Sequence, residues 1–257
     1  MCVTCSFERL AQIGVVIAAL SLGGCMNVQV PDPAVRYVAF GDSTTSGPAD
    51  RNYWESVRDQ LGEPADSFAD EGQGGETTGE GVTRLEELLA RELYPNAHTL
   101  LYWEGAGDLI QFIREHDAFL LFSPDDEDYP FSQELEEALD AIQGNIEGTV
   151  EAGRNGALKV YVATYYFLRA RVGDCDAMPL NVLLPDQADH ANVYVVRLND
   201  RIRQAAQNTE AVLVDVAARA GDIGLTADNY FNCNHLSAEG NQIVAGVFWD
   251  AINAQNR

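Results

Sequence analysis

Short apolar runs that alternate with helical segments constrain the fold of this chain more than any other feature. Runs rich in β-branched and aromatic residues predict strands at 35–40, 99–103, 158–163 and 211–216, with a shorter strand at 66–70. Apolar residues spaced three and four apart predict helices at 53–61, 80–93, 134–152, 191–206 and 237–253. This alternation favours a parallel sheet that is covered by helices on both faces.

Length and composition suit one large α/β domain, or at most two small ones. The chain has 257 residues, of which 46% are hydrophobic and 22% are charged, so a full core can be buried. Acidic residues number 40 against 16 basic ones, which gives a formal net charge of −24. A surface with this charge repels phosphate groups. Nucleic acids and anionic membrane surfaces are therefore excluded as expected partners.

The pattern of the first 25 residues predicts an export signal rather than part of the folded domain. Residues 13–22 form an uncharged run, which is shorter than the roughly 20 residues needed to cross a bilayer. The run ends in Leu22-Gly23-Gly24-Cys25, which resembles the lipobox of bacterial lipoproteins. That resemblance implies a signal peptide at 1–24, lipidation of Cys25, a tether at 25–34 and a folded domain at 35–257. The expected product is an exported lipoprotein anchored to the cell envelope. An ordinary signal peptide and a buried N-terminal helix are the alternatives.

The expected signal peptide decides which cysteines remain in the folded domain. Cys2 and Cys5 leave with the signal peptide and Cys25 carries the lipid, so Cys175 and Cys233 remain. An even pair in an oxidising compartment favours a disulfide over two buried thiols. A zinc site is not expected, because neither cysteine lies in a CxxC pair.

Two polar loops follow predicted strands. Gly41-Asp42-Ser43 comes after the first strand, and Glu104-Gly105-Ala106-Gly107-Asp108 comes after the third. The carboxyl ends of parallel strands meet at one edge of a sheet, so these loops are expected to share a crevice. A serine on a tight turn after a strand exposes its hydroxyl to a substrate. A turn or helix-capping serine is the structural alternative for Ser43.

A histidine and a glycine-rich loop complete the pattern. His235 lies in a polar loop before the last predicted helix, which Ser237 is placed to cap. A serine near the start and a histidine near the end are common in acyl-transfer enzymes. The loop 70–81 (DEGQGGETTGEG) allows close approach of backbone amides to a ligand. Its spacing does not fit a dinucleotide site, because Thr77 stands where the third glycine is needed.

Together these motifs resemble the SGNH/GDSL hydrolase family over nearly the whole chain after the signal. The resemblance implies a three-layer α/β/α sandwich with a parallel, flavodoxin-like sheet of about five strands. It implies ester hydrolysis through an acyl-enzyme, with Ser43 as nucleophile and His235 as general base. The backbone N–H groups of Ser43 and Gly75, with Gly74 as the alternative to Gly75, are expected to bind the oxyanion. The expected substrate is a small-molecule, lipid or carbohydrate ester, and neither metal nor organic cofactor is expected.

Two positions depart from the family pattern. Gly107 replaces the asparagine that supplies an oxyanion donor, and Asn232 replaces the usual aspartate before the histidine. An amide does not supply the negative charge that stabilises an imidazolium. A backbone carbonyl or Asp228 is therefore considered as the group that orients His235. If the missing donor limits turnover, Gly107→Asn is expected to raise it.

These departures leave other functions open. The second candidate is a catalytically weak or inactive lipoprotein that binds a glycan or lipid in the same crevice. The third is an acyltransferase that acts on phospholipids or glycans. Five aromatic residues near the strand ends are candidates for a substrate pocket, with at least half of them expected in the core: Tyr102, Trp103, Tyr165, Tyr166 and Phe167.

Overall fold

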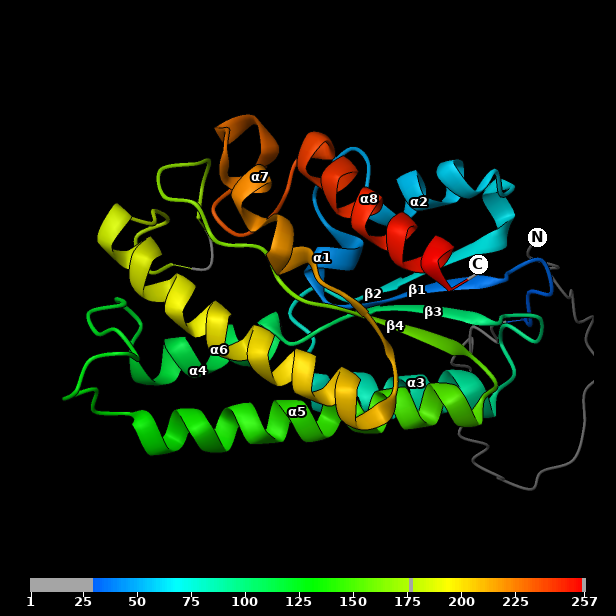
Figure 1. Ribbon diagram of the computed structural model, residues 1–257, viewed down its shortest axis with the longest axis horizontal. Coiled ribbons are helices and arrows are strands. Elements are labelled where there is room, and N and C mark those ends of the chain that lie inside the picture. The colour runs from blue at the N-terminus through cyan, green and yellow to red at the C-terminus, as the bar shows by residue number, and fades with distance from the viewer. Residues whose placement is uncertain (1–29, 176–177, 256–257) are drawn as a thin grey trace, which may run out of the picture. The chain divides into compact units, whose positions relative to one another are not determined.

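Five parallel strands form one sheet in the computed structural model of the protein, in the order β2-β1-β3-β4-β5 (Figure 1). Their bounds are β1 (Tyr37–Gly41), β2 (Phe68–Gly72), β3 (Thr99–Trp103), β4 (Lys159–Ala163) and β5 (Val212–Val214). Gly41 lies opposite both Gly72 and Trp103, so the three neighbouring strands β2, β1 and β3 end level with one another. This alignment brings the loops that follow them to a common edge, as the sequence predicted.

Helices cover both faces of this sheet (Figure 1). Helices α2 (Tyr53–Leu61) and α8 (Ala238–Ala254) pack together on one face. On the other face, α5 (Ser132–Asn155) packs against both α3 (Thr78–Ala90) and α6 (Pro185–Thr209). The predicted three-layer sandwich with a flavodoxin-like strand order is therefore confirmed.

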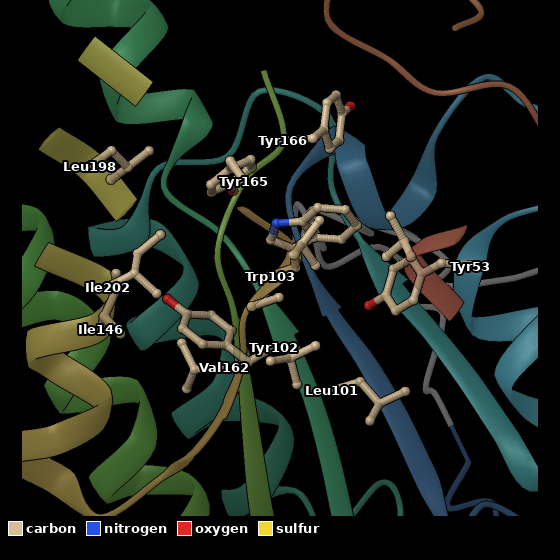
Figure 2. Packing of buried hydrophobic residues seen from close by; sticks show 14 of the residues in the cluster. Tyr53, Leu101, Tyr102, Trp103, Ile146, Val162, Tyr165, Tyr166, Leu198 and Ile202 are labelled. Atoms are coloured by element: carbon tan, nitrogen blue, oxygen red, sulfur yellow. The ribbon is translucent and has the colours of Figure 1, made fainter. Parts of the chain in front are cut away.

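The core is richest around the central strand β3, all of whose residues are buried. A strand covered on both faces needs apolar side chains at every position, which explains the continuous run TLLYW. Trp103 lies at the centre of an aromatic cluster with Tyr53, Tyr165 and Tyr166, at ring-centroid distances of 5.2 to 5.9 Å (Figure 2). This cluster supports the sheet edge at which the candidate site lies.

Several short elements were not predicted from the sequence. The most important are α1 (Ser43–Ser46) and α4 (Ala106–His116), which begin directly after the carboxyl ends of β1 and β3. The segment after β3 was expected to be a loop, but it turns into a helix within two residues. The remaining short elements are α7 (Ala220–Gly224), η1 (Ala65–Ser67), η2 (Val216–Arg219) and η3 (Ala227–Asn229).

Cys175 and Cys233 form the predicted disulfide. Both residues are buried, and the bond joins two loops that are 58 positions apart in the sequence. Cys233 lies in the loop that carries His235. The disulfide therefore ties this loop to the segment that follows β4.

The structure describes residues 30–175 and 178–255. The predicted signal peptide at 1–24 and the predicted lipidation site Cys25 lie outside these ranges. No helix among the described residues combines the length and the apolar character needed to cross a membrane.

Candidate active site

Ser43 and His235 meet at the carboxyl edge of the sheet. The Ser43 hydroxyl lies 2.9 Å from Nε2 of His235, although the two residues are 192 positions apart in the sequence. Ser43 is the first residue of α1, where the chain turns out of β1. His235 precedes α8, whose first turn is capped by the Ser237 hydroxyl as it accepts from the Gly240 N–H. Ser43 thus lies at the start of one helix, and His235 lies two residues before the N-cap of another.

Asn232 is the partner of the other nitrogen of the His235 ring. Its Oδ1 atom accepts hydrogen bonds from the backbone N–H groups of His235 and Asn234, at 2.8 and 3.1 Å, and lies 3.1 Å from His235 Nδ1. An atom that accepts two N–H groups is the amide oxygen, so Nδ1 carries the proton and Nε2 is free to accept from Ser43. The Asn232 side chain therefore occupies the orienting position, whereas Asp228 is exposed.

Asp42 is a buried acid that joins three elements beneath the nucleophile. Its carboxylate accepts from the Tyr165 hydroxyl at 2.6 Å, from the Thr44 N–H at 2.8 Å and from the Ala106 N–H at 3.2 Å. Burial raises the pKa of Asp42, and these hydrogen bonds oppose that rise. The arrangement fixes the ends of β1 and β4 to the start of α4. The role of Asp42 and its contact with Tyr165 were not predicted from the sequence.

The glycine-rich loop forms a tight turn next to Ser43. The Glu76 N–H donates to the Gln73 carbonyl at 3.2 Å, and Gly75 has a φ of +80°, as the third position of a type II turn requires. The Gln73 N–H donates in turn to the Gly41 carbonyl at 2.8 Å, which attaches the turn to the end of β1. Gly74 and Gly75 line a cavity of about 550 Å³ together with Ser43, Gly107 and His235. The structure thus brings together the five residues that the sequence singled out.

Gly107 lies where no side chain fits. A Cβ atom at this position would lie 2.0 Å from the carbonyl oxygen of Glu76 and 3.3 Å from that of Gly75. The start of α4 and the glycine-rich turn are therefore in direct backbone contact. The sequence-based expectation that Gly107→Asn raises turnover is not compatible with this packing, because an asparagine would push the turn away from the site.

A second, apolar cavity opens at Ser43 between α4 and α6. It measures about 60 Å³, and its wall is formed mainly by carbon from Leu109, Ile113, Tyr165, Tyr166, Val195 and Leu198. The larger cavity is more polar, since Gln111, Arg114 and Glu115 contribute to it. Of the five predicted aromatic residues, Tyr165 and Tyr166 line the apolar cavity.

The other three aromatic candidates do not line this apolar cavity. Tyr102 and Trp103 are fully buried in the core, and Phe167 packs against its edge. The expectation that at least half of the five belong to the core agrees with this placement. Among the described residues, no three His, Cys, Asp or Glu side chains are placed to share a metal ion.

The fold and these motifs match known proteins. Residues 39–243 match the profile of the GDSL-like lipase/acylhydrolase family. A GDSL-like lipase from Bacteroides thetaiotaomicron has a similar structure, with a TM-score of 0.55 and 17% sequence identity over 88% of this chain and 92% of that one. No curated protein sequence matches the chain significantly.

Two esterase structures are also similar. The esterase EstA from a Pseudoalteromonas species has a TM-score of 0.54 and 15% identity, covering 86% of this chain and 98% of that one. A variant of an acetyl-xylooligosaccharide esterase from Geobacillus has a TM-score of 0.56 and 17% identity, covering 87% and 96%. These similarities extend over the whole sandwich. Because the family profile spans most of the sequence, the chain belongs to the GDSL-like lipase/acylhydrolase family.

Proposed function

We propose that this hydrolase cleaves carboxylic esters through an acyl-enzyme on Ser43. The observation that carries the proposal is the 2.9 Å contact between the Ser43 hydroxyl and His235 Nε2, with Nδ1 of the same ring held by Asn232. A hydroxyl in contact with an imidazole nitrogen transfers its proton as it attacks a carbonyl carbon. His235 then returns this proton to the departing alcohol. A water molecule, activated by the same ring, releases the acid and restores Ser43.

The tetrahedral intermediate needs hydrogen-bond donors for its oxyanion. We assign this role to the backbone N–H groups of Ser43, at the first position of α1, and Gly75, on the neighbouring turn. Both residues line the same cavity as His235. Gly107 contributes no side-chain donor, and its role is to let the turn pack against α4.

The two cavities at Ser43 suggest how an ester is oriented. The apolar cavity suits the acyl chain, and the more polar, open cavity suits the alcohol portion. At about 10–15 Å³ for each water-sized group, a cavity of about 60 Å³ has room for only a few such groups. We therefore infer a short acyl chain, from acetate to about butyrate. The net charge of −24 disfavours strongly anionic substrates.

A serine-directed fluorophosphonate tests the activated nucleophile directly. We expect labelling of the wild-type protein at Ser43 and none of Ser43→Ala, with Ser46→Ala as a matched control from the same helix. Nitrophenyl esters from acetate to octanoate then test the inferred chain length, with the rate falling beyond butyrate. Turnover that survives in Ser43→Ala contradicts the assignment.

A non-catalytic binding protein is the second candidate. It is favoured by one observation, the amide of Asn232 at the position that orients His235. An amide holds the ring but does not stabilise its positive charge. The labelling experiment separates the two functions, because a merely binding crevice leaves Ser43 unlabelled while it retains a glycan or lipid.

We also propose, from the sequence of residues 13–25, that the protein is exported and anchored by a lipid on Cys25. The uncharged run followed by LGGC supports this proposal. The disulfide between Cys175 and Cys233 is compatible with an oxidising compartment.

A further inference from the structure

Glu104 is a buried carboxyl group whose hydrogen bonding is incomplete unless it carries a proton. It directly follows β3 and is only 2% exposed. The Tyr102 hydroxyl donates to its Oε2 atom at 3.0 Å. Its Oε1 atom has no donor among the described residues, although the Glu76 side chain lies within hydrogen-bonding reach. A hydrogen bond between two carboxyl groups requires a proton on one of them.

The proton can be assigned because, among the described residues, only Glu76 of the two acids is hydrogen-bonded to a cation. Arg84 of α3 holds Glu76 with two hydrogen bonds, from Nε at 2.6 Å and from Nη2 at 2.5 Å. The same guanidinium donates to the backbone carbonyl of Glu71 at 2.8 Å and stacks on the ring of Phe40. Glu76 therefore carries the negative charge. Burial and the neighbouring Glu76 carboxylate raise the pKa of Glu104 far above its ordinary value.

The packing around this pair leaves no space on either side. A Cβ atom on Gly81 would lie 2.1 Å from Oε2 of Glu104, so α3 needs a glycine there to accommodate the acid. On the other side, the Glu76 carbonyl fills the position of the missing Gly107 side chain. Glu76 also closes the turn that carries Gly75, through its N–H bond to Gln73.

We propose that Glu104 is a positioning residue: it stays protonated, donates a hydrogen bond to Glu76, and thereby holds the Gly74–Gly75 turn against Ser43. The inference rests on the proposed function, since the turn supplies an oxyanion donor only if the protein is an ester hydrolase. The arrangement that holds the turn consists of one neutral acid (Glu104), one carboxylate (Glu76) and one guanidinium (Arg84). Each comes from a different segment: the end of β3, the turn itself and α3.

Other titratable groups surround Glu104 and contribute to its environment. The turn presents Glu76, α3 presents Arg84, and the sheet edge and α4 present the remaining groups, namely Tyr102, Asp42, Tyr165 and Asp108. Arg84 is the cation of this set. Its hydrogen bonds go to Glu76 and Glu71, so its charge acts on Glu104 without a direct hydrogen bond.

The proton on Glu104 is tested by stability as a function of pH. An acid whose pKa is raised by folding contributes its full stability below the unfolded value of about 4.3, and that stability is lost as the pH rises toward the folded pKa. Glutamine mimics the protonated acid and does not titrate. The Tm difference between Glu104→Gln and wild type should therefore become more positive from pH 5 to pH 9. Glu87→Gln, an exposed change on α3, is the control and should give a constant difference.

The positioning role is tested by hydrogen–deuterium exchange and by kinetics. Glu104→Ala should speed exchange in peptides that cover 73–77, and Glu104→Gln should restore slow exchange. With a nitrophenyl acetate substrate, Glu104→Ala should lower kcat by up to about 10²-fold with little change in KM, and Glu104→Gln should retain most of kcat. If Glu104→Ala does not fold, Glu104→Leu replaces it in both measurements.

The outcomes are distinguishable from a failure of the proposed function. The Tm and exchange measurements need no turnover. They therefore test the protonation and the positioning role of Glu104 even if wild type fails to react with fluorophosphonate. A Tm difference that is constant or more negative toward pH 9 overturns the protonated acid. Unchanged exchange at 73–77 in Glu104→Ala overturns the positioning role, and so does a glutamine variant that behaves like alanine.

Discussion

Asn232 determines how far His235 can act as a base. Its oxygen accepts two backbone N–H groups, so the loop itself fixes the orientation of the amide. The amide selects the productive tautomer of His235, but it offers no charge to the imidazolium that forms when Ser43 loses its proton. The geometry of the site is therefore complete, whereas its electrostatic support is reduced.

Replacing Asn232 with aspartate should raise turnover. The two side chains have the same shape, and a carboxylate accepts the same N–H groups while stabilising the imidazolium. In a well-studied serine protease the reverse change lowers kcat by roughly 10⁴-fold, so we expect Asn232→Asp to give a gain of at least tenfold. The measurement is kcat for an acetate ester at pH 8. Asp228→Asn is the control and should leave kcat unchanged, because Asp228 is exposed. A loss in Asp228→Asn would restore it as the orienting acid.

Gly107→Asn should reduce activity, contrary to the expectation from the family pattern. The new Cβ atom would lie 2.0 Å from the carbonyl oxygen of Glu76, next to the Gly74–Gly75 turn that is proposed to bind the oxyanion. We expect fluorophosphonate labelling to slow by at least tenfold, because loss of one oxyanion donor costs roughly 10²–10³-fold in turnover. Gly144→Ala on α5 is a matched control, since a Cβ there meets no atom within 4 Å. Faster labelling of Gly107→Asn would show that the Gly74–Gly75 turn moves to accommodate the side chain and that an oxyanion donor was missing.

At the scale of elements, the disulfide connects the histidine loop to the segment after β4. The loop between Asn229 and Ser237 has one antiparallel bridge, Tyr230 with Leu236, and backbone hydrogen bonds such as that from the Phe231 N–H to the His235 carbonyl at 2.9 Å. The disulfide adds a covalent link from this loop to a segment outside the sheet, so we expect it to help keep His235 in place beside Ser43.

Removing the disulfide should lower both stability and activity. Cys175→Ala combined with Cys233→Ala is expected to lower the free energy of unfolding by about 2–4 kcal/mol, because the unfolded chain is no longer constrained. The loss should appear as a lower urea midpoint, and kcat should fall with it as His235 becomes less well placed. Titration of the native protein that finds both thiols free would contradict the bond.

Sequence patterns predicted the main elements well, and their failures have physical causes. Every predicted strand and helix is present; the bounds of α2 and β3 are as predicted, and the ends of the other elements are shifted. Helix α4 was missed because glycine at its N-cap, Gly105, and in its first turn, Gly107, gives the segment a low helix propensity, although Leu109 and Phe112 are buried at helical spacing. Helix α6 starts at Pro185, six residues before the expected position 191, where a proline at the first helical position was a usable signal.

At the scale of the whole molecule, parallel-sheet topology explains why the site was largely predictable. The loops that hold Ser43 and Gly107 were brought together because strand ends converge, which needs no knowledge of side-chain contacts. His235 was paired with Ser43 by the order of the motifs along the chain and by the family resemblance. The buried acids were not predictable in the same way. Nothing in the sequence around Glu104 shows that its side chain turns inward toward Glu76 and Arg84, because this contact depends on the packing of α3 against the sheet.

The net charge of −24 means that attachment to a membrane would require the predicted lipid anchor. A body with this charge is repelled by anionic lipid headgroups, so adsorption alone would not hold it at a membrane. A single acyl chain binds only marginally, whereas more than one chain gives stable anchoring. A diacylated Cys25 would meet this requirement while leaving the crevice around Ser43 free to receive soluble esters.

Cys25→Ser should therefore prevent lipidation without changing the chemistry at Ser43. Wild type expressed in a bacterial host is expected to incorporate labelled palmitate and to sediment with the membrane fraction. The variant should incorporate none, and its processing at the LGGC site should be blocked. Cys5→Ser is a matched control, because Cys5 precedes the apolar run and should not affect lipidation. Specific activity per fluorophosphonate-labelled Ser43 should be equal in all three proteins, since the site is built from residues 41–235. Wild type that takes up no palmitate would contradict the anchor and favour an ordinary signal peptide.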